Sequence, residues 1–140
     1  MKLLDIVESL RAKGQKKNMK GGGDCFTAAV NYMIENGHDN KNLRVVHGMV
    51  DGQGSLHGWE FTHAWCEDGD NIIDNSNGKD MVIPKIIYYS IGNINQKECK
   101  YYDMNGVFEQ IEKYGVTGPW EIENEVRPLP WNTERRIFGK

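Results

Sequence analysis

Residues 61–75 read FTHAWCEDGDNIIDN, and they predict a β-hairpin that decides the fold. Asp68-Gly69 is a turn signal, and runs rich in β-branched and aromatic residues lie on each side of it. A two-residue loop at this dipeptide places His63 opposite Asp74 when the residues are paired outward from the turn. Directly opposed residues share one face of a sheet, with Cβ atoms about 4.5–5.5 Å apart. The hairpin is therefore predicted to hold an imidazole beside a carboxylate.

The register of this hairpin determines which residue faces His63. A four-residue loop gives the same pairs, whereas a three-residue loop would shift the register so that Asn75 faces His63 instead. In the favoured register Asn75 points away, and three apolar side chains share the face of His63: Phe61, Trp65 and Ile72. These side chains would bury the His–Asp pair and limit its contact with water. Asp74 is therefore the predicted orienting residue.

Composition and charge indicate a globular chain without a strong pull toward charged partners. The 140 residues are 39% hydrophobic and 26% charged, and the formal net charge is -3. This length predicts one domain, residues 1–140, with one hydrophobic core. Neither nucleic acid nor a membrane is an expected partner, since the charge is slightly negative and no apolar run could cross a bilayer. A cytoplasmic location is expected, and three cysteines do not indicate a disulfide framework.

The other predicted elements follow from apolar periodicity and turn residues. Helices are predicted at residues 2–12, 25–36 and 105–114. Asp24 is a good N-cap for the second helix, and Gly37 is a good C-terminal stop. Strands are predicted at residues 43–50, 60–66, 71–76, 82–91 and 101–102. The core spans about residues 21–105, and residues 118–140 are predicted to form an extended arm that Trp120 and Trp131 anchor.

Cys25 is the candidate nucleophile because it follows three glycines and Asp24 at the start of a predicted helix. The thiolate is the reactive form of cysteine, and both a helix N-terminus and a nearby imidazolium favour that charge. The Asp24 carboxylate opposes it to some extent, so a histidine partner is needed. His63 would be that partner, with Asp74 orienting its ring. A cysteine without such neighbours is more often a buried structural residue.

Four stretches of the chain resemble the transglutaminase-like core, which belongs to the wider papain-like cysteine enzymes. They are Gly23-Asp24-Cys25 with Ala28-Ala29, then Leu43 to Gly48, then His63-Ala64-Trp65-Cys66-Glu67, and then Ile72 to Ser76. They follow the order of the family over about residues 21–78. The resemblance implies an α+β fold in which a cysteine-bearing helix packs on an antiparallel β-sheet. It also implies that Cys25 is the nucleophile, His63 the general base and acid, and Asp74 the orienting carboxylate.

Further residues are candidates for substrate binding or for stabilising an oxyanion. The backbone N–H of Cys25 is the donor that the site itself supplies. The papain branch carries a glutamine about six residues before the cysteine, and Asn18 and Gln15 are the nearest side chains to that position. His57 is a rim residue or a substrate contact, and His47 is expected to pack on its strand. The remaining substrate-binding candidates are Trp59, Trp65 and Asn75.

The predicted function is cleavage or exchange of an amide bond in a peptide, a protein or a small amide through a thioester. Hydrolysis is favoured because water is always available and no amine-binding site is recognisable, and transglutaminase-type amine transfer is the alternative. A second alternative is a non-catalytic module that binds a peptide or protein through Trp59, Trp120 and tyrosines. No cofactor and no metal are expected. A zinc site built from His57, His63, Cys66 and Cys99 is a further alternative, but these residues lack close Cys-x-x-Cys spacing.

Overall fold

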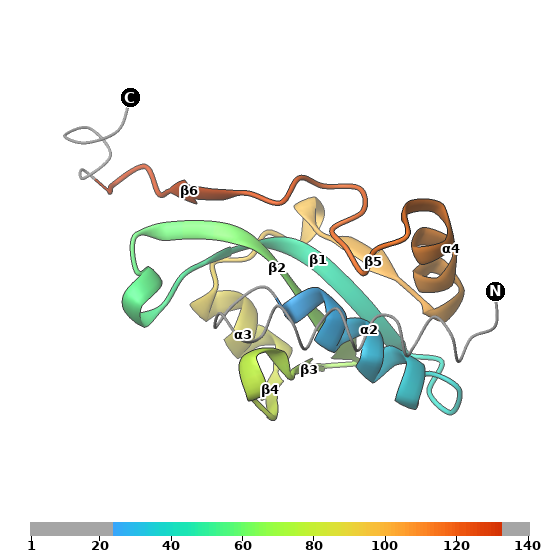
Figure 1. Cartoon of the computed structure of the whole chain (residues 1–140). Helices are drawn as coiled ribbons and strands as arrows, with labels where there is room; N and C mark the ends of the chain where they lie inside the picture. Colours follow the sequence, from blue (N-terminus) through green and yellow to red (C-terminus); the bar gives the residue numbers. More distant parts are fainter. Residues whose placement is uncertain (1–23, 133–140) are drawn as a thin grey trace.

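The computed structural model describes residues 24–132, so the predicted helix at residues 2–12 and the candidate Asn18 lie outside the described residues. The structure is α+β, with helices packed on an antiparallel sheet (Figure 1). In chain order the elements are α2 (Cys25–Asn36), β1 (Leu43–Asp51), β2 (Trp59–Asp68), β3 (Asn71–Asp74), β4 (Met81–Pro84), α3 (Lys85–Ile91), β5 (Lys100–Tyr102), α4 (Met104–Tyr114) and β6 (Val126–Pro128). Short 3-10 helices lie at η1 (Gly54–Leu56), η2 (Ser76–Gly78) and η3 (Gln96–Glu98).

The sheet has the strand order β4-β3-β2-β1-β5, and β6 pairs with β2 beside this row. One edge of β2 pairs with β1 along almost its whole length. On the other edge, β3 pairs with residues 66–68 and β6 pairs with residues 59–61. The paired segments leave an opening on that edge of β2, between the end of β3 and the start of the β6 pairing. The candidate histidine, His63, lies in this opening.

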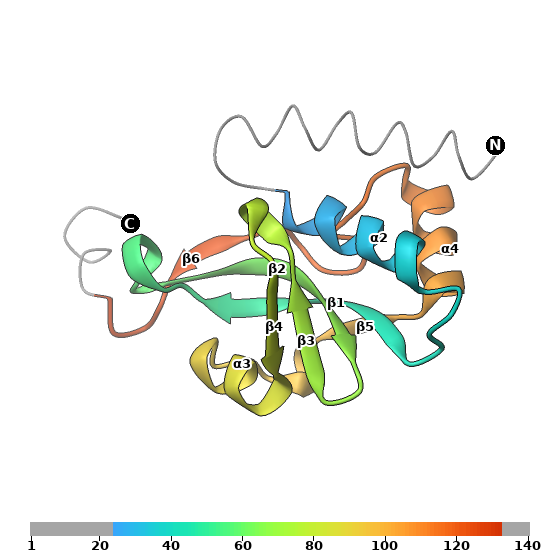
Figure 2. The ribbon, with the colours of Figure 1, turned by 90° about the horizontal axis from the view of Figure 1, so that it is seen from below.

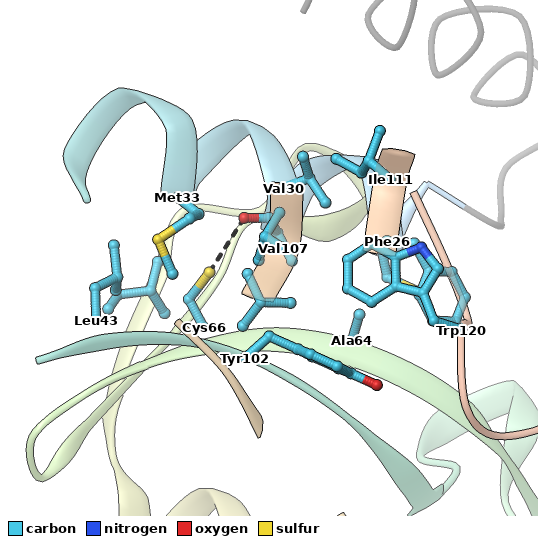
Figure 3. Close-up of a cluster of buried hydrophobic side chains, with 14 residues drawn as sticks. Phe26, Val30, Met33, Leu43, Ala64, Cys66, Tyr102, Val107, Ile111 and Trp120 are labelled. Carbon is cyan, nitrogen blue, oxygen red and sulfur yellow. Dashed lines mark hydrogen bonds between the residues drawn. The ribbon is translucent and has the colours of Figure 1, made fainter. Parts of the chain in front are cut away.

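Helices cover both faces of the sheet, and each face has its own cluster of buried side chains. The apolar side of α2 packs with α4 on the first face, and Figure 3 shows this cluster around Phe26, Val30 and Met33. Ala64 and Cys66 of β2 belong to the first cluster, while Trp65 belongs to the cluster that α3 covers. This alternation is the period-two pattern of a strand that is buried on both faces.

Most predicted elements are confirmed, but the strand predicted at residues 82–91 is wrong beyond Pro84. The chain turns there into α3, which ends at Gly92. Tyr88 and Tyr89 both pack into the cluster on the second face of the sheet. A strand would direct two consecutive side chains to opposite faces, whereas a helical turn directs both toward the sheet. Packing therefore outweighs the strand preference of the isoleucines and tyrosines.

Between residues 118 and 132, the described part of the arm is irregular apart from β6, and its two tryptophans differ. Trp120 is buried against the rings of His47 and Tyr102, so its predicted role as an anchor is confirmed. Trp131 is 56% exposed and contacts the exposed ring of His57 at a centroid distance of 5.0 Å. Trp131 therefore contacts the body of the protein at the surface and, unlike Trp120, does not enter the core.

The β2–β3 hairpin forms, but its turn differs from the prediction. Asp68 pairs with Asn71, so Gly69 and Asp70 form the two-residue turn. Gly69 has a φ of 60°, and a positive φ at the first loop position is the preference of glycine in a type II′ turn. The predicted register, with Asp68 and Gly69 in the turn, is therefore wrong by two positions.

Candidate active site

Cys25, His63 and Asp74 come together in the opening beside β2. Cys25 begins α2 and belongs to the cluster on the first face of the sheet, while His63 alternates with Ala64 and lies toward the second face. They can meet because β2 continues past the end of β3 at Asp74. In Figure 2 the first turn of α2 lies beside the loop that joins β3 to β4.

His63 contacts Asp74 although the predicted register is wrong. His63 Nε2 and Asp74 Oδ2 are 3.0 Å apart. A shift by two residues keeps every side chain on the same face of the sheet, so Asp74 changes from an opposed to a diagonal neighbour of His63. A shift by one residue would have turned Asp74 to the other face. His63 and Asp74 therefore share a face after any register shift by an even number of residues, and lie on opposite faces after an odd one.

Asp74 is a buried carboxylate whose two oxygens are both used. Oδ2 accepts hydrogen bonds from His63 and from the hydroxyl of Tyr88, at 2.9 Å for Tyr88. Oδ1 accepts from the hydroxyl and the backbone N–H of Ser76, at 2.6 and 3.0 Å. Burial alone would raise the pKa of Asp74, but these hydrogen bonds and the charge of His63 hold it well below its usual range. Asp74 therefore stays ionised while it holds the ring of His63.

His63 is protonated at neutral pH in this environment. Burial by itself would lower its pKa, but hydrogen bonds and charge interactions with Asp74 and Cys25 outweigh burial and raise the pKa to about 9. Because Nε2 faces Asp74, Nδ1 is the nitrogen that remains for Cys25. The ring also stacks on Trp65 at a centroid distance of 6.1 Å and meets the edge of Phe61 at 5.7 Å. The imidazole is thus fixed in orientation by Asp74 and by the two aromatic rings.

The N-terminus of α2 lacks a side-chain cap. Asp24 occupies the N-cap position, as predicted, but its side chain makes no capping hydrogen bond to the helix. Both carboxylate oxygens instead accept the backbone N–H of Asn77, at 2.9 and 3.0 Å. No side chain of the described residues therefore caps the first turn of α2, where the N–H of Cys25 lies. These N–H groups are suited to face a negatively charged oxygen.

A cavity of about 550 Å³ opens onto the three residues, and Cys25, His63 and Asp74 all lie in its wall. Apolar side chains from several elements make up much of the lining: Val50, Phe61, Ile83, Ile91, Ile94 and Val126. Lys79, Asp51 and Asn124 are among its polar groups. This size and composition are typical of a site for a small ligand or for part of a larger one.

The substrate-binding candidates His57, Trp59 and Trp65 do not line this cavity. His57 is exposed beside Trp131, and Trp59 begins β2 opposite Pro128, so neither lines the cavity. Trp65 is 1% exposed and donates its indole N–H to Glu67. Its ring stacks on His63 and does not line the cavity.

Asn75 lies on the other side of the site, away from the large cavity. It lines a narrow crevice together with Cys25 and Asp74. Its side-chain oxygen is buried and has no hydrogen-bond partner within residues 24–132.

Two residues that sequence reasoning missed hold Asp74 in place. Ser76 follows it by two positions, a spacing at which a carboxylate often accepts a bond from the backbone, so a local signal existed. Tyr88 lies 14 positions from Asp74, and no local signal in the sequence connects the two. Its bond to Asp74 depends on α3, which the sequence predicted as a strand.

The structure does not support the alternative zinc site. Across residues 24–132 no group of three or more His, Cys, Asp or Glu side chains is arranged to hold a metal ion. Cys66 donates to the carbonyl of Ala29 on the first face of the sheet, and Cys99 contacts Asn95 on the second. The four proposed ligands are therefore not brought together.

Comparisons of the chain with protein-family models, with curated proteins and with solved structures find no match. The resemblance to the transglutaminase-like core thus rests on the residues of this chain alone. In the described part of the chain, no helix has the length and apolar character that a membrane span requires.

Proposed function

We propose that this protein is a cysteine-dependent acyl-transfer enzyme that breaks an amide or peptide bond through a thioester on Cys25. The observation that carries the proposal is the convergence of Cys25, His63 and Asp74 on the wall of one cavity. A thiol, an imidazole and a carboxylate in this order form an activated nucleophile with an oriented base. The resemblance to the transglutaminase-like core supports the same roles for the same residues.

In the first half of the reaction, the Cys25 thiolate attacks the carbonyl carbon and the carbonyl oxygen becomes negatively charged. The N–H groups at the start of α2, which Asp24 does not cap, stabilise this oxygen. His63 donates its proton to the amide nitrogen, the C–N bond breaks and the amine leaves. Asp74 keeps the ring oriented throughout, because its carboxylate is fixed by Tyr88 and Ser76.

In the second half, water attacks the thioester while His63 takes a proton from that water. The C–S bond breaks, the carboxylic acid leaves, and the Cys25 thiolate and the protonated His63 are restored. An amine in place of water would give a new amide by the same steps, which is transglutaminase-type transfer. Hydrolysis is favoured because water reaches an open cavity and no amine-binding site is recognisable.

The cavity supports a substrate that presents an apolar group next to the scissile bond. Phe61, Ile83 and Ile94 line it together with other apolar side chains. Enclosing an apolar group in such surroundings contributes about 25 cal/mol per Å² of area removed from water. A peptide with a bulky apolar residue at the cleaved bond fits this lining better than a charged one.

Alkylation by iodoacetamide between pH 5 and 9 tests whether Cys25 is activated. Because the thiolate is the reactive species, Cys25 should react at neutral and weakly acidic pH faster than glutathione. Peptide mapping separates it from Cys66 and Cys99. All three thiols are buried, at 8% exposed for Cys25, 1% for Cys66 and 9% for Cys99, so the other two control for the effect of burial without a neighbouring imidazole. A Cys25 rate that matches glutathione across the whole range contradicts the proposal.

A library of fluorogenic peptide amides tests the reaction itself. Wild-type protein should release the fluorophore fastest from peptides with apolar residues, and Cys25→Ala should release none. Addition of a primary amine distinguishes the acceptors, since transfer would yield the amine conjugate and hydrolysis the acid. Binding of peptides without any turnover, together with an unreactive thiol, would instead indicate the non-catalytic module.

A further inference from the structure

Within residues 24–132, two aspartates precede α-helices, and one of these two acts as a cap. Asp103 precedes α4, and its side chain accepts the N–H of Gly106 at 2.8 Å. Asp24 precedes α2, is 6% exposed and makes no bond of this kind. An N-cap aspartate ordinarily accepts an N–H of the first helical turn. The carboxylate of Asp24 therefore serves another purpose.

The partner of Asp24 lies in the turn that follows β3. Both oxygens of Asp24 accept the backbone N–H of Asn77. The preceding residue, Ser76, donates twice to Asp74. The short turn at Ser76 and Asn77 thus contacts both parts of the site. The backbone N–H of Asn77 binds Asp24, and Ser76 binds Asp74.

We infer that Asp24 is a positioning residue that sets the placement of Cys25 relative to the His63–Asp74 pair. Asp24 and Cys25 are adjacent in the backbone, so a bond that fixes Asp24 also fixes the start of α2. Through Asn77 and Ser76, this bond ties the thiol to the carboxylate that orients the imidazole. It also keeps the Asp24 carboxylate away from the N–H groups of the first helical turn. The inference rests on the proposed function, since it concerns the same thiol and imidazole.

The charge of Asp24 and its hydrogen bond have opposite effects on the thiolate, which makes the inference testable. A negative charge beside Cys25 disfavours a thiolate. If charge were the main effect, any neutral replacement would speed alkylation. If position is the main effect, Asp24→Asn should keep the rate, because an amide oxygen can still accept the N–H of Asn77. Asp24→Ala should lose it, because alanine has no acceptor.

The experiment measures the iodoacetamide rate of Cys25 against pH in wild type, Asp24→Asn and Asp24→Ala. An ordinary thiol is only about 1% thiolate at pH 6.5, so loss of the thiolate–imidazolium pair should slow alkylation by about 10- to 100-fold at that pH. The profile of Asp24→Ala should then rise only at alkaline pH. Asp24→Asn should keep the neutral-pH reactivity of the wild type.

Asp103→Ala is the matched control, because it removes a true helix cap of the same residue type. It should lower Tm by about 3 °C and leave the alkylation profile unchanged. Circular dichroism checks that each variant is folded. If Asp24→Ala does not fold, Asp24→Ser replaces it, since serine is a good N-cap and its shorter side chain favours the cap over the bond to Asn77.

Each outcome bears on one of the two proposals. A fast wild type, a fast Asp24→Asn and a slow Asp24→Ala support the inference. A fast wild type with an equally fast Asp24→Ala overturns the inference and leaves the proposed function standing. Equal slowing in Asp24→Asn and Asp24→Ala also overturns it, because the bond would then not be the cause. A wild-type thiol that reacts like glutathione overturns the proposed function and, with it, the inference.

Discussion

His47 and His63 are both buried on neighbouring strands, yet their surroundings give them opposite charge states. His47 lies opposite Ala64, and His63 lies opposite Gly48, so the two rings face different sides of the sheet. His47 is packed among the rings of Phe26, Tyr102 and Trp120. Burial, and to a lesser extent the charge of His63, lowers its pKa to about 3. His63 has a carboxylate partner, and its pKa is raised to about 9.

The difference shows that burial alone does not decide the charge of a histidine. Both rings lose water, which disfavours the charged form, but only His63 gains a fixed anion and a hydrogen-bonded thiol. The ring nitrogens of His47 have no hydrogen-bond partner among the described residues. His47 therefore contributes to packing, whereas His63 has the partners that a proton-transfer residue needs.

The largest effect is expected when each histidine is replaced, because His63 has a role in proton transfer and His47 a role in packing. We expect His63→Gln to lower kcat/KM on a cleaved amide by about 10²- to 10⁴-fold, because the proton donor is lost. His47→Phe should leave kcat/KM within about twofold and the stability unchanged or slightly higher, because an aromatic ring without polar atoms fits the same surroundings. Steady-state kinetics and urea unfolding of both variants measure this. Comparable losses of kcat/KM in the two variants would break the comparison.

The pH dependence of stability should differ in sign for the two histidines. The stability contributed by His63 is fully present below pH 6.5 and is lost as the pH rises through about 9, because its folded pKa is raised. The stability associated with neutral His47 is present above pH 6.5 and is lost as the pH falls toward about 3. The effect is about 3 kcal/mol for His63 and about 5 kcal/mol for His47.

Urea unfolding at a series of pH values measures both effects. His63→Gln should flatten the alkaline side of the curve, and His47→Phe should flatten part of the acidic side. Asp74 also contributes on the acidic side, because its folded pKa is depressed and its stabilisation is lost below about pH 4. A curve that keeps its alkaline slope in His63→Gln would contradict the assignment of that slope to His63.

The smallest effect is expected from removing the hydroxyl of Tyr88. This tests how much its hydrogen bond to Asp74 contributes to the orientation of His63. Tyr88→Phe deletes one of the bonds to Asp74 and leaves the aromatic ring in place. It should destabilise the protein by about 1 kcal/mol and lower kcat by about tenfold or less. The same experiment on Tyr102, which bonds to Glu121 near His47, should affect stability but not kcat. An unchanged kcat in Tyr88→Phe would show that Ser76 alone suffices to hold Asp74.

Sequence reasoning found the Cys25–His63–Asp74 cluster because each step depended on a local rule. Helix start signals placed Cys25, and strand alternation placed His63 and Asp74 on one face. The register was wrong by two positions, and the conclusion survived because only the parity of the register decides the face. Asp24 was correctly placed before the helix, but its hydrogen bond to Asn77 could not be foreseen, since it joins residues 53 positions apart.

The other features that sequence reasoning did not predict also depend on contacts between residues far apart in the chain. Residues 85–91 carry strand-forming side chains, and only the packed sheet beneath them makes a helix the better solution. Trp131 is apolar enough to enter a core, but its ring packs on His57, which is itself exposed. The cavity is formed by side chains from β1, β2, β4, β6, α2 and α3 together, and no single stretch of sequence encodes it.

The long separation between Asp24 and Asn77 also has a consequence for biosynthesis. Closing a loop of this length is entropically costly, and it must wait until the intervening strands have paired. A chain emerging from the ribosome exposes Cys25 well before β3 and the following turn have been made. In that interval the thiol has neither an imidazole beside it nor a helix start held in place. On the proposed function, we therefore expect a reactive Cys25 only in the assembled sheet and an ordinary cysteine in an unfinished chain.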